Sequence, residues 1–73
     1  MKTVTLNQGE PYMTLGQLLK WTGTIHTGGE AKFFLRNTEV YVNDEREMRR
    51  GKKLRQGDHI KIGEESEYVI RQP

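Results

Sequence analysis

The chain has 73 residues and no cysteine; 33% of its residues are hydrophobic and 30% are charged. This length supports one domain with a small core, and the lack of cysteine excludes disulfides and thiolate metal sites. No apolar run approaches the roughly 20 residues of a membrane span and no signal peptide is recognisable, so we expect a single cytoplasmic domain over residues 1–73.

The N-terminal part predicts a strand followed by a helix. Residues 2–6 alternate apolar side chains with threonines, which is the period of a half-buried strand. Thr14 is the expected N-cap of a leucine-rich helix, and Gly23 is its expected C-terminal cap.

A second helix is predicted over about residues 29–36. Thr27 and Glu30 have the Thr-x-x-Glu spacing of a capping box, in which each side chain satisfies a backbone N–H of the other residue. Asn37 can end this helix, because asparagine tolerates the left-handed conformation.

The remainder of the chain predicts β-structure. Asn43 and Asp44 supply one turn, and Gln56-Gly57-Asp58 supplies a second. The short β segments expected around these turns are residues 40–42, 45–48, 59–62 and 68–70. The predicted class is α+β, with two helices packed on a small curled antiparallel sheet that has an added N-terminal strand.

Charge is concentrated in residues 49–55, which we call the basic segment. It holds five of the twelve cations, and the rest of the chain has seven cations against ten acidic residues. A concentrated cationic patch attracts polyanions, above all phosphate backbones. The five cations are Arg49, Arg50, Lys52, Lys53 and Arg55.

Two β motifs lie before and near the end of the basic segment, Glu39-Val-Tyr-Val-Asn43 and Leu54-Arg-Gln-Gly-Asp58-His-Ile60. Through these motifs and their separation, residues 13–62 resemble the S4 RNA-binding domain family. The resemblance is closer still to the short, free-standing bacterial S4 proteins of the YaaA/YbcJ type, through Gly28-Gly29-Glu30-Ala31-Lys32 and Arg49-Arg50-Gly51-Lys52-Lys53-Leu54. It implies the αL-type S4 fold, binding to structured RNA such as ribosomal RNA, and no catalytic activity.

The chain departs from the wider family at both helix starts. Thr14-Leu15 replaces the usual Arg-Leu, and Gly28-Gly29 replaces the usual Ser-Arg. The paired glycines lack side chains, so the N–H groups of the second helix can approach a phosphate closely.

The expected RNA site combines the second helix with a hairpin over residues 46–55. Lys32 and Arg36 lie one helical turn apart on the exposed side of that helix, and the family resemblance places this side next to the hairpin. The proposed RNA-binding residues are Gly28, Gly29, Lys32, Arg36, Arg46, Arg49, Arg50, Lys52, Lys53 and Arg55.

Three aromatic residues have two readings each. We expect Phe33 to pack against the N-terminal strand, and Trp21 and Tyr41 to have core or supporting positions. The alternative is stacking on unpaired bases. His26 next to the glycines is a further candidate for phosphate contact, but two histidines do not make a zinc site.

The leading expectation is a monomeric, non-enzymatic RNA-binding protein without cofactor, metal or small-molecule substrate. Its partner would be ribosomal RNA or a ribosomal particle, with a role in ribosome assembly or quality control. The alternative is a protein–protein module whose basic segment docks an acidic partner. An enzyme is disfavoured, because there is no cysteine nucleophile and no Gly-Lys-Ser/Thr phosphate loop.

Overall fold

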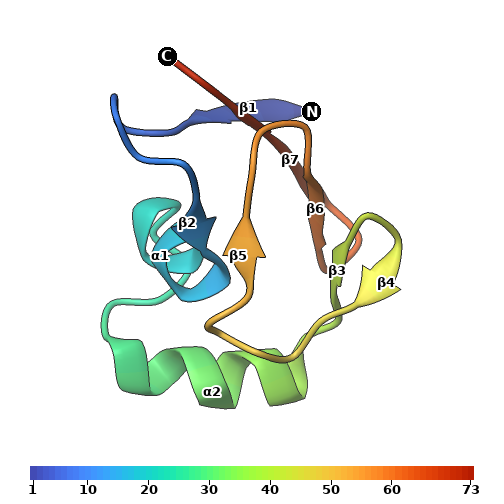
Figure 1. The fold of residues 1–73 in the computed structure, drawn as a ribbon. Helices are drawn as coiled ribbons and strands as arrows, with labels where there is room; N and C mark the ends of the chain where they lie inside the picture. Colours follow the sequence, from blue (N-terminus) through green and yellow to red (C-terminus); the bar gives the residue numbers. More distant parts are fainter.

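The computed structural model describes all 73 residues, which form two helices, a five-stranded sheet and a two-stranded ribbon (Figure 1). The helices are α1 (Leu15–Trp21) and α2 (Gly28–Asn37). The strands are β1 (Lys2–Thr5), β2 (Met13–Thr14), β3 (Val40–Val42), β4 (Glu45–Arg46), β5 (Lys53–Leu54), β6 (His59–Ile62) and β7 (Ser66–Arg71). The predicted α+β class is confirmed.

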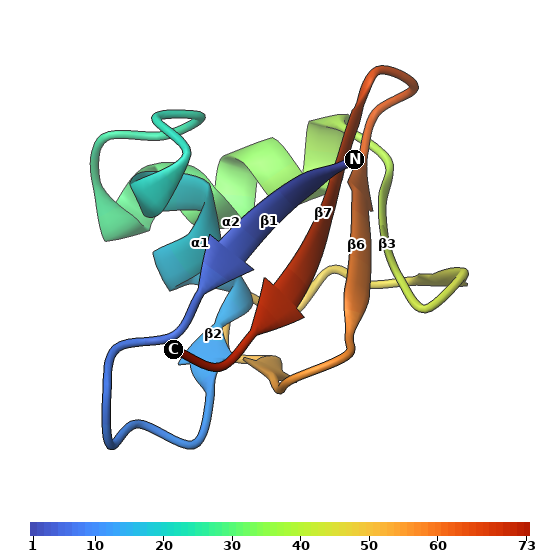
Figure 2. The same cartoon turned by 90° about the horizontal axis from the view of Figure 1, so that it is seen from above.

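The large sheet has the order β1-β7-β6-β3-β4 (Figure 2). The β7–β6, β6–β3 and β3–β4 pairs are antiparallel, as expected. The added strand β1 runs parallel to β7, with Val4 opposite Ile70. Parallel pairing is possible because nearly the whole chain lies between these two strands, so no tight turn forces them to be antiparallel.

Both helices begin where the sequence predicts. Gln17 N donates to Thr14 Oγ1 at 3.2 Å, and Thr14 N donates back to Gln17 Oε1 at 2.8 Å. At α2, Thr27 N donates to Glu30 Oε1 at 3.1 Å. Gly23 has a φ of +78° just after α1, which is the left-handed geometry expected of its cap.

A single core joins the helices to the sheet. Leucines of α1 and the inner side of α2 pack against alternate residues of the strands, because successive side chains of a strand point to opposite faces. The largest fully buried side chains are Val4, Leu15, Leu18, Leu19, Leu35, Val40, Leu54, Ile60 and Ile70. Neither helix has the length and apolar character needed to cross a membrane.

The expected packing of Phe33 and Trp21 is wrong. Phe33 is 70% exposed and Trp21 is 62% exposed. Each follows a buried leucine or alanine of its helix by two residues, and a step of two residues leads to the other side of a helix. Tyr41 is half-buried in β3, and its hydroxyl donates to Glu39 at 3.0 Å, as suits a supporting position.

Residues 46–55 do not form the predicted hairpin. β4 pairs with β3, whereas β5 pairs with β2, with Met13 opposite Leu54. The turn between β3 and β4 has a positive φ at Asn43 (52°) and Asp44 (69°), so the tight hairpin closes there and is complete by residue 46. The chain then leaves the sheet and crosses toward the helices (Figure 1).

Candidate nucleic-acid interface

The backbone of the basic segment is attached to the start of α1. Leu15 N donates to Lys52 O at 2.9 Å, and Gly16 N donates to Arg50 O at 2.8 Å. These are first-turn N–H groups, which have no partner inside their own helix. A Cβ at Gly16 would lie 3.3 Å from Arg50 O, so a side chain there would press on the basic segment. The glycine thus permits this close approach.

The ribbon formed by β2 and β5 determines which side chains in and next to β5 are buried and which are exposed. Leu54 is fully buried in the core, while Lys53 and Arg55 on either side of it are exposed. This alternation follows from the two-residue period of a strand. Leu54 therefore anchors the segment and presents its neighbours to solvent.

Four cations surround one hollow on the surface, which we call the cationic hollow. No acidic or apolar side chain takes part in its lining. Cations that converge on a concave surface raise the local concentration of anions. The lining residues are Arg49, Gly51, Lys52, Lys53 and Arg55.

Tyr12 lies against the same part of the surface. Lys53 Nζ is 5.0 Å from the centroid of its ring, and Arg55 Cζ is 5.4 Å from it. Both distances are within the range of cation–π attraction. No sequence signal pointed to this residue, because the β2–β5 pairing alone brings it to residues about 40 positions later in the chain.

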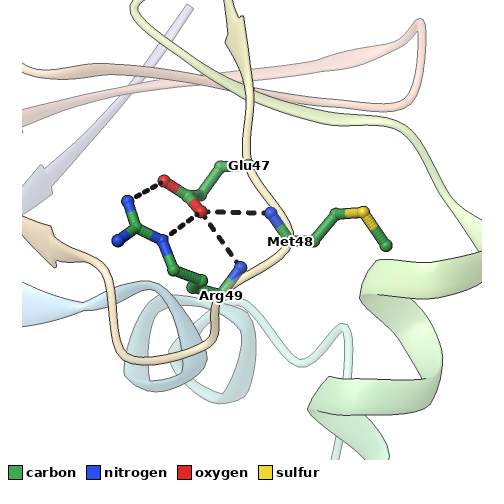
Figure 3. A network of polar contacts seen from close by, with 3 residues as sticks. All are labelled: Glu47, Met48 and Arg49. Atoms are coloured by element: carbon green, nitrogen blue, oxygen red, sulfur yellow. Dashed lines mark hydrogen bonds and ion pairs between the residues drawn. The ribbon is translucent and has the colours of Figure 1, made fainter.

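Glu47 is the acidic partner of the basic segment (Figure 3). Its Oε2 accepts from Arg49 Nε at 3.0 Å and its Oε1 from Arg49 Nη2 at 3.2 Å, while Oε2 also accepts from the backbone N of Met48 at 3.1 Å and of Arg49 at 3.0 Å. The Glu47 side chain is 11% exposed, against 75% for Arg49. Glu47 therefore fixes the entry to the segment and offsets part of the charge of Arg49.

The pair shifts the pKa of both groups. Hydrogen bonds from the Arg49 side chain, reinforced by the two backbone N–H groups, hold the pKa of Glu47 below its ordinary value against the opposing effect of burial. The hydrogen bond to Glu47 in turn raises the pKa of Arg49. Protonation of Glu47 would weaken every one of these contacts.

Stability should therefore fall on acidification, and Glu47→Gln should remove part of that dependence. A carboxyl whose pKa is lowered by folding stabilises the protein above its unfolded pKa of about 4.3, and this contribution is lost as pH falls through the folded value. At pH 7, Glu47→Gln should cost about 1 kcal/mol, because the charged hydrogen bonds become neutral.

Urea unfolding at pH 7 and at pH 3 measures both effects. Glu10→Gln, on an exposed loop residue, is the matched control. An equal loss for both variants at pH 7, or an unchanged pH dependence in Glu47→Gln, would contradict this role for Glu47.

Arg50 connects the basic segment to α2. Its Nη1 donates to Gly28 O at 2.9 Å. Lys32 and Arg36 follow Gly28 at intervals of one helical turn, so the three residues form one row along the helix. Lys32 and Arg36 are both exposed. The row thus extends the cationic surface from Arg50 along α2.

Gly29 lies apart from these cations. It lines a separate, partly apolar hollow on the other side of α2, together with Ile25, Phe33 and Phe34. The carboxylate of Glu30 already lies at the N-terminal turn of α2, where its Oε1 accepts from His26 N at 3.2 Å and from Thr27 N. Of the two glycines, only Gly28 is brought to the basic segment.

Arg46 occupies a position of mixed charge. It shares a hollow with Arg49 and Lys52, but Glu45 and Glu47 line the same hollow. Its Nη1 is also 4.0 Å from Glu39 Oε1. Arg46 consequently lies beside the cationic hollow with part of its charge compensated.

The two sequence motifs meet through one hydrogen-bond network. Asn43 Nδ2 donates to Asp58 Oδ1 at 3.0 Å, and His59 N donates to Asn43 Oδ1 at 2.9 Å. Asp58 Oδ2 accepts from Arg55 N at 2.8 Å. Gly57 has a φ of +90°, which confirms its predicted role as a turn former. The network fixes the backbone of Arg55 at the end of the basic segment.

No group of three or more histidine, aspartate or glutamate side chains is arranged to hold a metal ion. His26 is exposed on the connector before α2. His59 lies in β6, with Nε2 3.6 Å from Glu67 Oε1. The two histidines thus belong to different parts of the structure.

Comparison with known proteins adds two findings. A family model described as "S4 domain" matches residues 4–71, a range that includes both β motifs. A protein of Bacillus subtilis (strain 168), named "Probable ribosome maturation protein RlbA", is 54% identical over 50 residues, which cover 68% of this chain and 70% of that protein. The matched family range extends beyond residues 13–62 into β1 and β7, the first and last strands of the chain.

Proposed function

Since the chain belongs to the S4 domain family, we propose that it binds structured RNA, such as ribosomal RNA, without catalysing a reaction. The RNA-binding surface would combine the basic segment with the exposed row of α2. The observation that carries this proposal is the cationic hollow, whose four cations have no acidic residue among them. Arginine can grip a phosphate with two hydrogen bonds and lysine acts as a point charge.

Binding should be directed mainly at the sugar–phosphate backbone. The cations of the hollow and of α2 lie on an open surface and, apart from the half-buried Lys52, are exposed, which suits an RNA helix or junction recognised by its shape. The name of the Bacillus relative supports a ribosome-related role. We place the protein, as a monomer, in ribosome assembly or quality control, acting on ribosomal RNA or a ribosomal particle.

A titration of labelled ribosomal RNA fragments, followed by fluorescence anisotropy, tests the proposal. If about four phosphates are neutralised, log K should fall with log salt at a slope of roughly −3 to −4. An absence of RNA affinity, or an affinity that does not change with salt, would refute it. An acidic protein partner would instead be retained by the immobilised protein after nuclease treatment.

A further inference from the structure

The ring of Tyr12 is adjacent to two cations that have no other partner. The ion pairs of the structure involve Arg46, Arg49 and His59. Neither Lys53 nor Arg55 takes part in one, yet both side chains lie over the same ring, at 5.0 and 5.4 Å from its centroid. The ring is therefore the feature that determines where these two charges are found.

Two like charges so close in the chain would otherwise move apart. Lys53 and Arg55 are two residues apart and therefore leave the strand on the same side, where they repel each other. Long cationic side chains also have many rotamers, and ordering them costs free energy. The face of an aromatic ring carries negative charge density, which attracts both cations and offsets this repulsion.

The backbone holds the ring in place. Tyr12 directly precedes β2, whose residues Met13 and Thr14 pair with Leu54 and Lys53. Continuing this antiparallel register brings Tyr12 opposite Arg55. Lys53 and Arg55 both line the cationic hollow, so the position of the ring sets the position of half of its charges.

From these contacts we propose that Tyr12 is a positioning residue of the RNA-binding surface. Its ring holds Lys53 and Arg55 at a fixed spacing before RNA arrives, and so lowers the entropic cost of ordering them on the phosphate backbone. The inference rests on the proposed function, because it assigns Tyr12 a role in that same site.

The test compares Tyr12→Leu and Tyr12→Phe, each in the wild-type protein and in the Lys53→Gln/Arg55→Gln background. With a ribosomal RNA hairpin as probe, Tyr12→Leu should weaken binding about two- to five-fold, the range of an exposed cation–π interaction. Tyr12→Phe should bind within about two-fold of wild type, since it keeps the π face. The salt slope should not change in either variant, because no cation is lost.

The glutamine background separates positioning from other roles. Without the two cations, Tyr12→Leu should have no further effect on affinity. A loss of the same size in that background would show that Tyr12 supports the ribbon or stacks on a base, and would overturn the proposal. Wild-type affinity in Tyr12→Leu would overturn it as well.

A second measurement does not depend on the folding of any variant. In the NMR spectrum of the wild-type protein without RNA, the ring should shift the Lys53 Hε and Arg55 Hδ signals upfield, and unshifted signals would contradict the proposed geometry. Failure of the wild-type protein to bind any RNA would refute the proposed function, whereas wild-type binding with no effect of Tyr12→Leu would refute this inference alone.

Discussion

Replacing Lys52, Lys53 and Arg55 together by glutamine should weaken RNA binding by about 100-fold at about 0.1 M salt. Each phosphate contact of a cation releases counterions, so the loss of three should also reduce the magnitude of the salt slope by roughly 2 to 3. All three side chains line the cationic hollow. None of them forms an ion pair within the protein, so folding stability should hardly change.

The matched control removes three positive charges from the five-stranded sheet, none of which lines the cationic hollow. Lys2, Lys61 and Arg71 belong to β1, β6 and β7, and their replacement by glutamine changes the net charge by the same amount. Anisotropy titrations at several salt concentrations compare the two triple variants. Equal losses in both would mean that net charge alone governs binding and would contradict a localised site.

Leu54→Ala should reduce the free energy of unfolding by about 2–5 kcal/mol, the cost of removing a buried leucine side chain and leaving a cavity. Leu54 is fully buried, and a domain of this size has a total stability of only about 4–11 kcal/mol. The same change should weaken RNA binding, because Leu54 anchors the basic segment to the core. Urea unfolding and anisotropy titration measure the two effects.

Ile70→Ala provides the control for this double effect. Ile70 is also fully buried, but it lies in β7, and its hydrogen bonds with Gly57 and Asp58 after the basic segment are formed by backbone atoms, which alanine keeps. Ile70→Ala should reduce the free energy of unfolding by a similar amount and leave RNA affinity intact under conditions in which both variants are folded. Leu54→Met, which conserves volume, should cost less than about 1.5 kcal/mol. Parallel losses of affinity in Leu54→Ala and Ile70→Ala would contradict the anchoring role.

The helices and most of the strands could be predicted because their signals are local. The start of each helix is indicated by a capping pair only three residues apart, Thr14 with Gln17 at α1 and Thr27 with Glu30 at α2. The turn at Asn43 and Asp44 depends on residues that tolerate a positive φ. The two β motifs then indicated the family, which the family model and the Bacillus relative confirm.

Predictions failed where position depends on contacts between distant segments. The sequence predicts one hairpin over residues 46–55, because a basic stretch between two turns is locally compatible with that. In the structure, unpaired N–H groups of α1 bind the carbonyls of Arg50 and Lys52, and β5 pairs with β2 instead of β4. No pattern among neighbouring residues indicates which distant segment a strand will pair with.

By itself, the sequence determined both helices, the strands of the five-stranded sheet, the family and the concentration of positive charge in residues 49–55, since each depends on residue type and short-range spacing. The β2–β5 ribbon was not among the predicted elements, because it pairs segments about 40 residues apart. Only the tertiary structure decided how that charge is divided. Arg49 is paired with Glu47, Arg50 is bound to Gly28 on α2, and Lys53 and Arg55 lie against the ring of Tyr12. The physical reason is that cations are placed by whichever acceptors and π faces the packed chain brings within a few ångströms of them.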